Sequence, residues 1–244
     1  MIVIVLGMHR SGTSVISGIL HLNHILMGSS STFKPKPLPQ NPKGFYENFE
    51  FRKLNDQILN EVNYNVKSFN SNIPFPYPHK KTENKMENLI RNQIKKYNHW
   101  GWKDPRTCLT LDHWIDIILK FRNKKNIKVV FTIREPFSVA NSLKNRDNID
   151  FDAGIKLWSI YNNRALDFVQ EYELDSFYFY YEDLILNPNL VVSKLFDFID
   201  FEYDKNIITQ FVDSKLNRSE KNKQLIDLEE CRDLNKKFKN LSSV

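Results

Sequence analysis

The sequence is poor in cysteine and has no long apolar run. Only two of its 244 residues are cysteine, Cys108 and Cys231, and neither belongs to a C-x-x-C pair. A disulfide framework and a cysteine-based zinc site are therefore excluded, and a reducing compartment is favoured. No apolar run approaches the ~18–20 residues of a membrane-spanning helix, and no signal peptide precedes the first apolar residues. We expect a cytoplasmic protein without stable membrane insertion.

Basic residues exceed acidic ones, 35 Lys and Arg against 29 Asp and Glu, which gives a net charge of +6. This balance suits a polyanionic small ligand, nucleic acid or an anionic membrane surface equally well. The basic residues are dispersed and form no motif interleaved with aromatic residues, so no nucleic acid partner is expected. A chain of this length can bury one sizeable core. We expect a single domain over 1–244, with 1–213 as its core and 214–244 lying partly over the site and fraying at its end.

The first residues combine a strand, a loop and a helix. Residues 2–6 are consecutive apolar residues, as in a strand buried on both faces. A loop bounded by Gly7 and Gly12 follows, and apolar residues then recur at helical spacing from Val15 to Leu20. In this order the backbone N–H groups of the loop and the helix N-terminus converge on a site for an anion.

Strands and helices alternate along the rest of the chain. Strand patterns occupy residues 99–103, 128–134 and 177–181, and the clearest helical patterns occupy 83–97 and 151–173. Two proline-rich stretches, 28–44 and 68–81, indicate long loops; the second is either an acceptor-side loop or a plain linker. The alternation predicts an α/β fold with a P-loop NTPase-like central parallel β-sheet flanked by helices on both faces. Ligands of such sheets bind at the carboxyl ends of the strands.

The spacing of Gly7 and Gly12 matches the phosphate-binding loop G-x-x-x-x-G-K-[ST], with one departure. Thr13 stands at the lysine position, and a cation, Arg10, lies inside the loop. A nucleotide triphosphatase needs that lysine to reach the β- and γ-phosphates, so a different ligand is expected. The loop resembles the 5′-phosphosulfate loop of the sulfotransferase family. The donor of that family is 3′-phosphoadenosine 5′-phosphosulfate (PAPS), and its nucleotide product is 3′-phosphoadenosine 5′-phosphate (PAP).

The resemblance implies that this loop binds the donor. The backbone N–H groups and hydroxyls that would grip the 5′-phosphate and sulfate belong to Ser11, Gly12, Thr13 and Ser14. Arg10 lies where the family places a cation over the bridging oxygen. That oxygen gains negative charge as the S–O bond breaks, so a fixed cation there acts mainly in the transition state.

Later stretches extend the resemblance to about three quarters of the chain. Arg134 and Ser142, eight positions apart, match the family's 3′-phosphate motif. Lys103, in a Lys-Asp-Pro run, resembles the lysine of tyrosylprotein and related sulfotransferases that neutralises charge on the transferring sulfonate. Tyr181 matches a tyrosine near the adenine. Where family members often close a loop over the 3′-phosphate, this sequence has Arg218 and Ser219.

Transfer to a hydroxyl or amine also needs a general base. Glu47 resembles the glutamate of several bacterial and glycan-type members, although a carboxylate at a helix start is also favoured by the helix dipole. The competing candidates are Glu50, Asp112 and His113.

Three further polar residues are expected to have structural roles. Asp104 and Arg106 should form an ion pair that orients the loop after Lys103. His9, inside the first loop, should shape that loop rather than ionise.

We therefore expect a sulfotransferase that moves a sulfuryl group from PAPS to an acceptor hydroxyl or amine, without a metal. Carbohydrate is favoured as acceptor by family analogy only, and the oligomeric state stays open. One alternative is a small P-loop kinase using ATP and magnesium, which Thr13 and the lack of a clear magnesium-binding carboxylate disfavour. The other is a non-catalytic nucleotide-binding protein.

Overall fold

A four-stranded parallel sheet with the strand order β2–β1–β3–β4 carries the fold. Strand β1 (Ile2–Leu6) lies between β2 (Trp100–Lys103) and β3 (Ile127–Ile133), and β4 (Asp175–Tyr180) pairs with the outer side of β3. This computed structural model describes residues 1–34, 36–38, 41–212 and 229–244. The predicted α/β fold with a central parallel sheet is confirmed.

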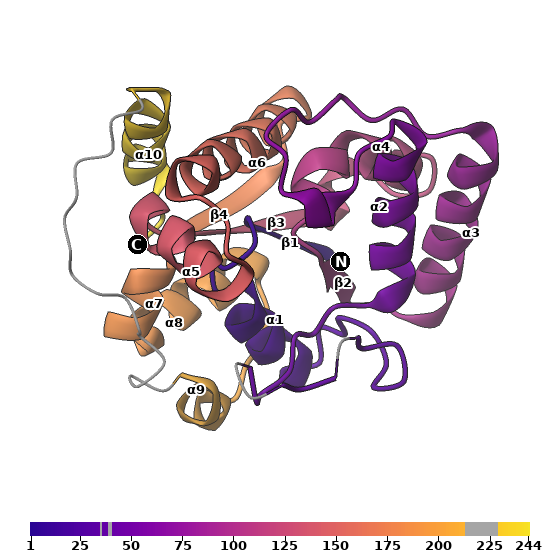
Figure 1. Ribbon diagram of the computed structural model, residues 1–244. Helices are drawn as coiled ribbons and strands as arrows, with labels where there is room; N and C mark the ends of the chain where they lie inside the picture. Colours follow the sequence, from indigo (N-terminus) through magenta and orange to yellow (C-terminus); the bar gives the residue numbers. More distant parts are fainter. Residues whose placement is uncertain (35, 39–40, 213–228) are drawn as a thin grey trace.

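Helices cover both faces of the sheet (Figure 1). One face is covered by α2 (Phe49–Glu61), α3 (Lys80–Lys96), α4 (Thr107–Leu119), α5 (Pro136–Asp147), α6 (Phe151–Glu171) and α10 (Glu229–Leu241). The other is covered by α1 (Thr13–Leu22), α7 (Tyr181–Leu186), α8 (Pro188–Ile199) and α9 (Lys205–Phe211). Short 3₁₀ turns lie at Val66–Ser68 and Lys124–Asn126. Within the described ranges, no helix is long and apolar enough to cross a bilayer.

The buried position of β1 explains its unbroken apolar sequence. Ile2, Ile4 and Leu6 point into the core on the side of α4 and α6. Val3 and Val5 point into the core on the side of α1 and α8. Because successive side chains of a strand alternate between faces, a strand covered on both sides needs apolar residues at every position.

The strand order brings the predicted site stretches to one edge of the sheet. Strand β2 pairs with one side of β1, and the chain then crosses to β3 on the other side of β1. The strand order therefore reverses direction at β1. A crevice forms at such a switch point, at the carboxyl ends of the strands. The loop after Leu6, Lys103 at the end of β2 and Arg134 after β3 all lie at this edge.

The C-terminal residues 229–244 pack against the sheet. Phe238 is fully buried, and its ring lies 5.1 Å from that of Phe131. Beyond α10, the Ser243 N–H donates to the Tyr178 carbonyl, and the Ser243 hydroxyl accepts from the Tyr178 N–H. The apolar face of α10 and the edge of β4 thus contact the described end of the chain, and the fraying expected there stays a prediction.

Candidate active site

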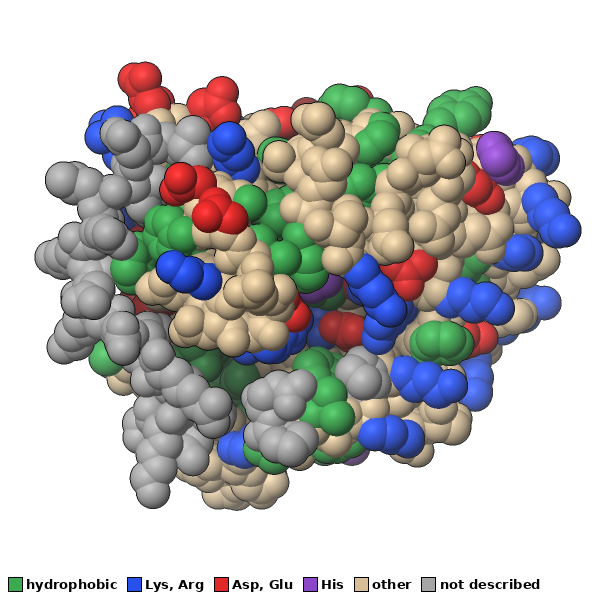
Figure 2. All heavy atoms as spheres, in the orientation of Figure 1, with side chains coloured by type: hydrophobic (Ala, Val, Ile, Leu, Met, Phe, Trp, Pro, Cys, Tyr) green, Lys and Arg blue, Asp and Glu red, His purple; other side chains and the backbone are tan. Residues whose placement is uncertain are grey.

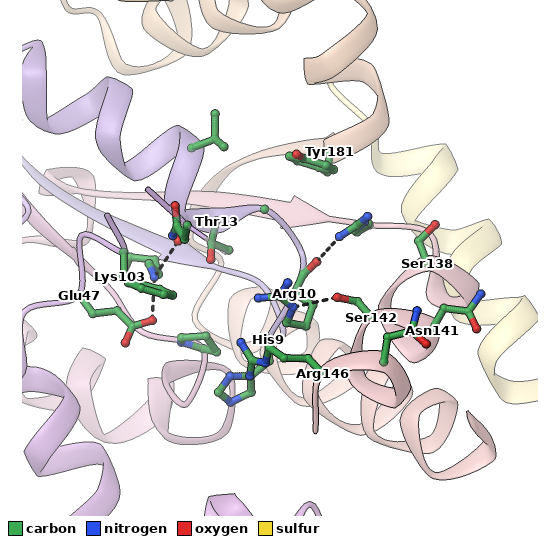
Figure 3. A pocket seen from close by; sticks show the side chains of 18 of the residues that line it. His9, Arg10, Thr13, Glu47, Lys103, Ser138, Asn141, Ser142, Arg146 and Tyr181 are labelled. Carbon is green, nitrogen blue, oxygen red and sulfur yellow. Dashed lines mark hydrogen bonds and ion pairs between the residues drawn. The ribbon is translucent and has the colours of Figure 1, made fainter. Parts of the chain in front are cut away.

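A cavity of about 740 Å³ opens at the carboxyl ends of β1, β2 and β3. Its walls come from the loop between β1 and α1, the segment 41–47, the end of β2, helix α5 and the start of α7 (Figure 3). Figure 2 shows basic and acidic side chains gathered in the hollow at the middle of this face. Segments that are more than one hundred residues apart in the sequence thus share one polar cavity.

The loop after β1 is shaped by left-handed backbone at two positions. Arg10 has φ 72° and Gly12 has φ 80°, and the Ser11 N–H closes the turn by donating to the Met8 carbonyl. A Cβ on Gly12 would lie 2.1 Å from Cδ2 of Tyr181, so the tyrosine ring packs directly on the glycine backbone. Helix α1 begins at the next residue, and its first-turn N–H groups have no acceptors within the helix.

Three predicted donor-binding residues from different elements meet beside this loop. The Arg10 Nε–H donates to the Ser142 hydroxyl at 2.9 Å, and an Arg134 guanidinium N–H donates to the Arg10 carbonyl at 2.9 Å. The Arg134 guanidinium also lies 5.1 Å from the ring centre of Tyr181 and 3.9 Å from the Glu182 carboxylate. Arg134 and Ser142 thus both line the cavity, while their binding of a 3′-phosphate stays a prediction.

Burial acts on both arginines, and repulsion by other cations acts on Arg10. Burial lowers the pKa of Arg10 to about 10, and the positive charges of Arg146 and Arg134 contribute to this shift. Burial also lowers the pKa of Arg134. Both guanidinium groups stay protonated at neutral pH, and their closeness makes the cavity favourable for an anion.

Lys103 and Glu47 form an ion pair on the opposite wall. The Lys103 ammonium lies 2.8 Å from Oε1 of Glu47 and 3.5 Å from the Ser14 hydroxyl, and its side chain is only 2% exposed. Arg52 adds a second cation 3.7 Å from Oε2 of Glu47. This pair places a carboxylate and an ammonium side by side next to the N-terminus of α1 (Figure 3).

A buried polar network holds the turn after Lys103. The predicted ion pair between Asp104 and Arg106 is confirmed at 2.7 Å, and Arg106 also pairs with Asp56 at 2.6 Å. Asn55 donates to Asp104 at 2.8 Å. Burial alone would lower the pKa of Arg106 and raise that of Asp104. The attraction between them, together with the charge of Asp56 on Arg106 and the Asn55 hydrogen bond to Asp104, outweighs burial, so the pKa of Arg106 is raised and that of Asp104 is lowered.

The structural role of Asn55 was not predicted from the sequence, although its position on the apolar face of a helix indicated one. It lies at the helical spacing of the apolar residues Phe51, Leu54 and Ile58, and it is fully buried with them. A polar residue on an apolar face of a helix needs partners in the core. Its side-chain oxygen accepts from Trp114 and Thr110, and its amide holds Asp104.

His9 lines the cavity but is held in its neutral form. Burial lowers its pKa to about 3, with a smaller contribution from the charge of Arg106. Its ring contacts the ring edges of Tyr161 and Phe69 at 5.7 and 6.2 Å. These contacts agree with the expectation that His9 shapes the loop rather than ionises.

Several candidate residues do not line the cavity. Ser11 belongs to the loop between β1 and α1, but it is fully buried and does not line the cavity. Glu50 is exposed near the start of α2, and the 68–81 stretch is held outside the cavity by Arg164, whose guanidinium donates to the Ile73 and Pro74 carbonyls. The two candidates on α4, also outside the lining, are Asp112 and His113. Two further candidates, Arg218 and Ser219, belong to the segment 213–228, which lies outside the described residues.

Helix α5 contributes more of the cavity than its matched motif indicated. Apart from Ser142, its lining residues were missed: Ser138, Asn141, Lys144, Asn145 and Arg146. The positions 138, 141, 142 and 145 follow the i, i+3, i+4, i+7 spacing of one helix face. The sequence therefore contained a pattern for these residues: polar side chains at the spacing of one helix face, on a helix whose other face is apolar.

The sequence and the fold both resemble those of sulfotransferases. A family model described as "Sulfotransferase family" matches residues 3–205. The fold is similar to the sulfotransferase domain from the curacin biosynthetic pathway (17% identity, TM-score 0.57, covering 97% of this chain and 96% of that one). It is also similar to the sulfotransferase domain from the Synechococcus PCC 7002 olefin synthase (16%, 0.58, 98% and 94%) and to sulfotransferase STF9 from Mycobacterium avium (14%, 0.51, 99% and 76%). No curated protein matches the sequence.

Proposed function

The chain belongs to the sulfotransferase family, and on that premise we propose that it transfers a sulfuryl group from PAPS to an acceptor hydroxyl or amine. Carbohydrate is the acceptor class favoured by analogy with family members. One observation carries the proposal. The Arg134–Arg10–Ser142 cluster and the Glu47–Lys103 pair line the same cavity, on either side of the loop that begins α1.

The residues of the cavity fit a donor with anionic groups at two points. PAPS carries a 5′-phosphosulfate and a 3′-phosphate. The first suits the α1 N-terminus with the Thr13 and Ser14 hydroxyls, where a helix end and its free N–H groups attract an anion. The second suits Arg134 with Ser142, since a planar guanidinium can bind a phosphate through two hydrogen bonds. The absence of a side chain at Gly12 lets the Tyr181 ring pack directly on the loop backbone at the edge of the cavity.

In the proposed mechanism, Glu47 acts as the general base. When bound, PAPS supplies a sulfuryl group activated by its anhydride bond to phosphate. The Glu47 carboxylate accepts the proton of the acceptor hydroxyl or amine as attack begins. Lys103, fixed 2.8 Å from Glu47, adds positive charge at the transferring group. Arg10 neutralises the charge that develops on the departing phosphate. These cations are already in place before the reaction, so little reorganisation opposes their effect.

Calorimetric titration with PAP in the presence of EDTA tests the donor assignment. We expect micromolar binding of PAP, at least about tenfold weaker binding of 5′-AMP, and a comparable loss for Arg134→Ala, because a charge-assisted bidentate contact would be removed. Arg91→Ala is the matched control, since Arg91 lies on α3 away from the cavity and pairs with Glu87. Binding of ATP alone, and only with magnesium, would instead favour the kinase alternative.

A further inference from the structure

We propose that the acceptor carries an anionic group, a carboxylate or a phosphate, and that Arg146 together with Lys144 binds it. The inference rests on the proposed function, because it takes the donor to occupy the part of the cavity formed by Arg134, Ser142 and the α1 N-terminus. It adds the chemical class of the acceptor to that function.

The first observation is the place of Arg146 in the cavity wall. Ser138, Ser142 and Arg146 follow one another at four-residue steps along α5. Each step is one turn, a rise of ~6 Å, so the three line the wall in a row. Figure 3 shows Arg146 beside His9, at the side of the cavity opposite Tyr181. Arg146 is therefore far from the end assigned to the adenine.

The second observation is that this side of the cavity also holds the general base. In Figure 3 Glu47, His9 and Arg146 lie along the same side, below the loop that carries Arg10. The acceptor must reach Glu47 to lose its proton. An acceptor larger than a single hydroxyl group would then extend along His9 toward Arg146.

The third observation is the excess of positive charge. Among the described residues that line the cavity, Glu47 is the single carboxylate, whereas the cations are Arg10, Lys103, Arg134, Lys144 and Arg146. The proposed donor contacts account for the first three cations. Lys144 and Arg146 remain, and the repulsion of Arg10 by Arg146 contributes to the lowered pKa of Arg10, after burial. An anion between them would relieve this repulsion.

The fourth observation is the geometry of Arg146 itself. Its Nε–H donates to both carboxylate oxygens of Asp147 at 2.9 and 3.0 Å, while its two terminal amino groups donate no hydrogen bond to any described residue. Asp147 does not line the cavity. Such a contact holds the guanidinium in place and leaves the amino groups for a bidentate contact with a carboxylate or phosphate. Cations in the last turn of α5 also suit the helix dipole, but the dipole does not require them to face the cavity.

Three matched probes test the inference: p-nitrophenyl β-D-glucoside, p-nitrophenyl β-D-glucuronide and p-nitrophenyl β-D-glucoside 6-phosphate. They differ only at C6, which carries a hydroxymethyl group, a carboxylate or a phosphate. Each is titrated calorimetrically into protein saturated with PAP. We expect the carboxylate or the phosphate probe to bind at least about tenfold more tightly than the glucoside, as for a charge-assisted contact. Whichever is favoured identifies the anionic group.

Variants separate this contact from the donor site. Arg146→Gln should reduce the preference for the anionic probe to within about threefold and leave the PAP affinity nearly unchanged, while Arg146→Lys should keep part of the preference. Arg91→Gln, with the same loss of charge on α3, should behave as the wild type.

Two results overturn the inference. One is binding of none of the probes, or equal binding of all three, by PAP-saturated protein. The other is a large loss of PAP affinity in Arg146→Gln with the probe preference intact, which would assign Arg146 to the donor site. Failure of PAP itself to bind the wild-type protein is a separate result, and it contradicts the proposed function.

Discussion

At the scale of single residues, Gly12 matters through the side chain that it lacks. With φ 80° it adopts a left-handed conformation, and a Cβ would lie 2.1 Å from the Tyr181 ring. Gly12→Ala should therefore displace Tyr181 and distort the loop. We expect at least about tenfold weaker PAP binding and a loss of unfolding free energy of about 1–3 kcal/mol, from backbone strain and the clash. Calorimetry and urea unfolding measure the two effects.

Gly44 provides the matched control for this prediction. Its φ is 91°, but the nearest atoms to an added Cβ lie 3.8 Å away, which is ordinary contact. Gly44→Ala shares the backbone strain without the collision. If both variants bind PAP equally well, the contact between Tyr181 and the glycine backbone does not shape the donor site.

His9 predicts a specific dependence of stability on pH. Burial lowers its pKa from 6.5 to about 3 in the folded protein. The unfolded chain therefore binds more protons below pH 6.5, so the contribution of His9 to stability falls as the pH drops from about 6.5 to about 3, and it is constant above pH 6.5. Between pH 7 and pH 5 this loss amounts to about 2 kcal/mol at most.

Urea unfolding of wild type and His9→Gln at pH 7 and pH 5 isolates this effect, because the other titrating groups are common to both proteins. The wild type should lose more unfolding free energy than the variant over this interval. His79→Gln serves as the control, since the His79 side chain is 69% exposed. Identical pH slopes for wild type and His9→Gln would show that His9 ionises freely in the folded state.

The residues of the site could be predicted from the sequence only where a local pattern marks them. Gly7 and Gly12 fix the loop, and the spacing of Arg134 and Ser142 follows from a strand that leads into a helix. The pairing of Glu47 with Lys103 joins residues 56 positions apart, and no local pattern contains that contact. Their proposed roles in binding and proton transfer stay predictions.

At the scale of secondary structure elements, Asp104 links β2 to α2 and α4. It is fully buried, and it binds Asn55 on α2 and Arg106 just before α4. Asp104→Asn removes the charge facing the buried Arg106 guanidinium. Because a buried charge left without its partner is strongly unfavourable, we expect a loss of about 3–5 kcal/mol in unfolding free energy. Urea unfolding at pH 7 measures it.

Asp56→Asn is the comparison for this prediction, since Asp56 pairs with the same arginine but its side chain is 41% exposed. An exposed ion pair contributes about 0–1 kcal/mol. Equal losses in the two variants would mean that burial of Asp104 adds nothing to its pairing with Arg106.

The strands and the longest helices were predictable, but their exact boundaries were not. Strand β1 is apolar at every position, β3 is mostly apolar, and α6 has a long amphipathic pattern. Helix α2 begins at Phe49, and the Asn48 side chain caps it by accepting from the Glu50 N–H. Helix α7 has six residues, too few for a distinct helical period in the sequence. Its place follows from packing rather than from its own sequence.

At the scale of the whole molecule, the strand order is the feature that the sequence leaves open. Alternating strands and helices imply a parallel sheet, but they do not say which strands are neighbours. The order β2–β1–β3–β4 brings together the ends of β2 and β3 on either side of the first loop. Solved sulfotransferase structures with 14–17% identity share the fold over nearly the whole chain. The fold therefore tolerates replacement of most residues of the chain.

The C-terminal helix extends the core beyond the residues that the family model matches. The match ends at residue 205, whereas Phe238 of α10 is fully buried against Phe131, Trp158 and Tyr178. Phe238→Ala should lower the unfolding free energy by about 3–5 kcal/mol, because a large cavity would form on the face of β3 and β4. Lys236→Ala, on the exposed side of the same helix, should change it by less than about 0.5 kcal/mol.

Binding distinguishes a core role of α10 from a role in the active site. The described residues 229–244 do not line the cavity. At a temperature where Phe238→Ala is fully folded, its PAP affinity should therefore lie within about threefold of the wild-type value, a difference of less than about 0.7 kcal/mol. A large loss of stability with PAP affinity retained would establish that the sheet needs α10 for its core and not for its ligand. An unchanged stability would mean that residues 1–212 form the stable unit and that α10 only rests on its surface.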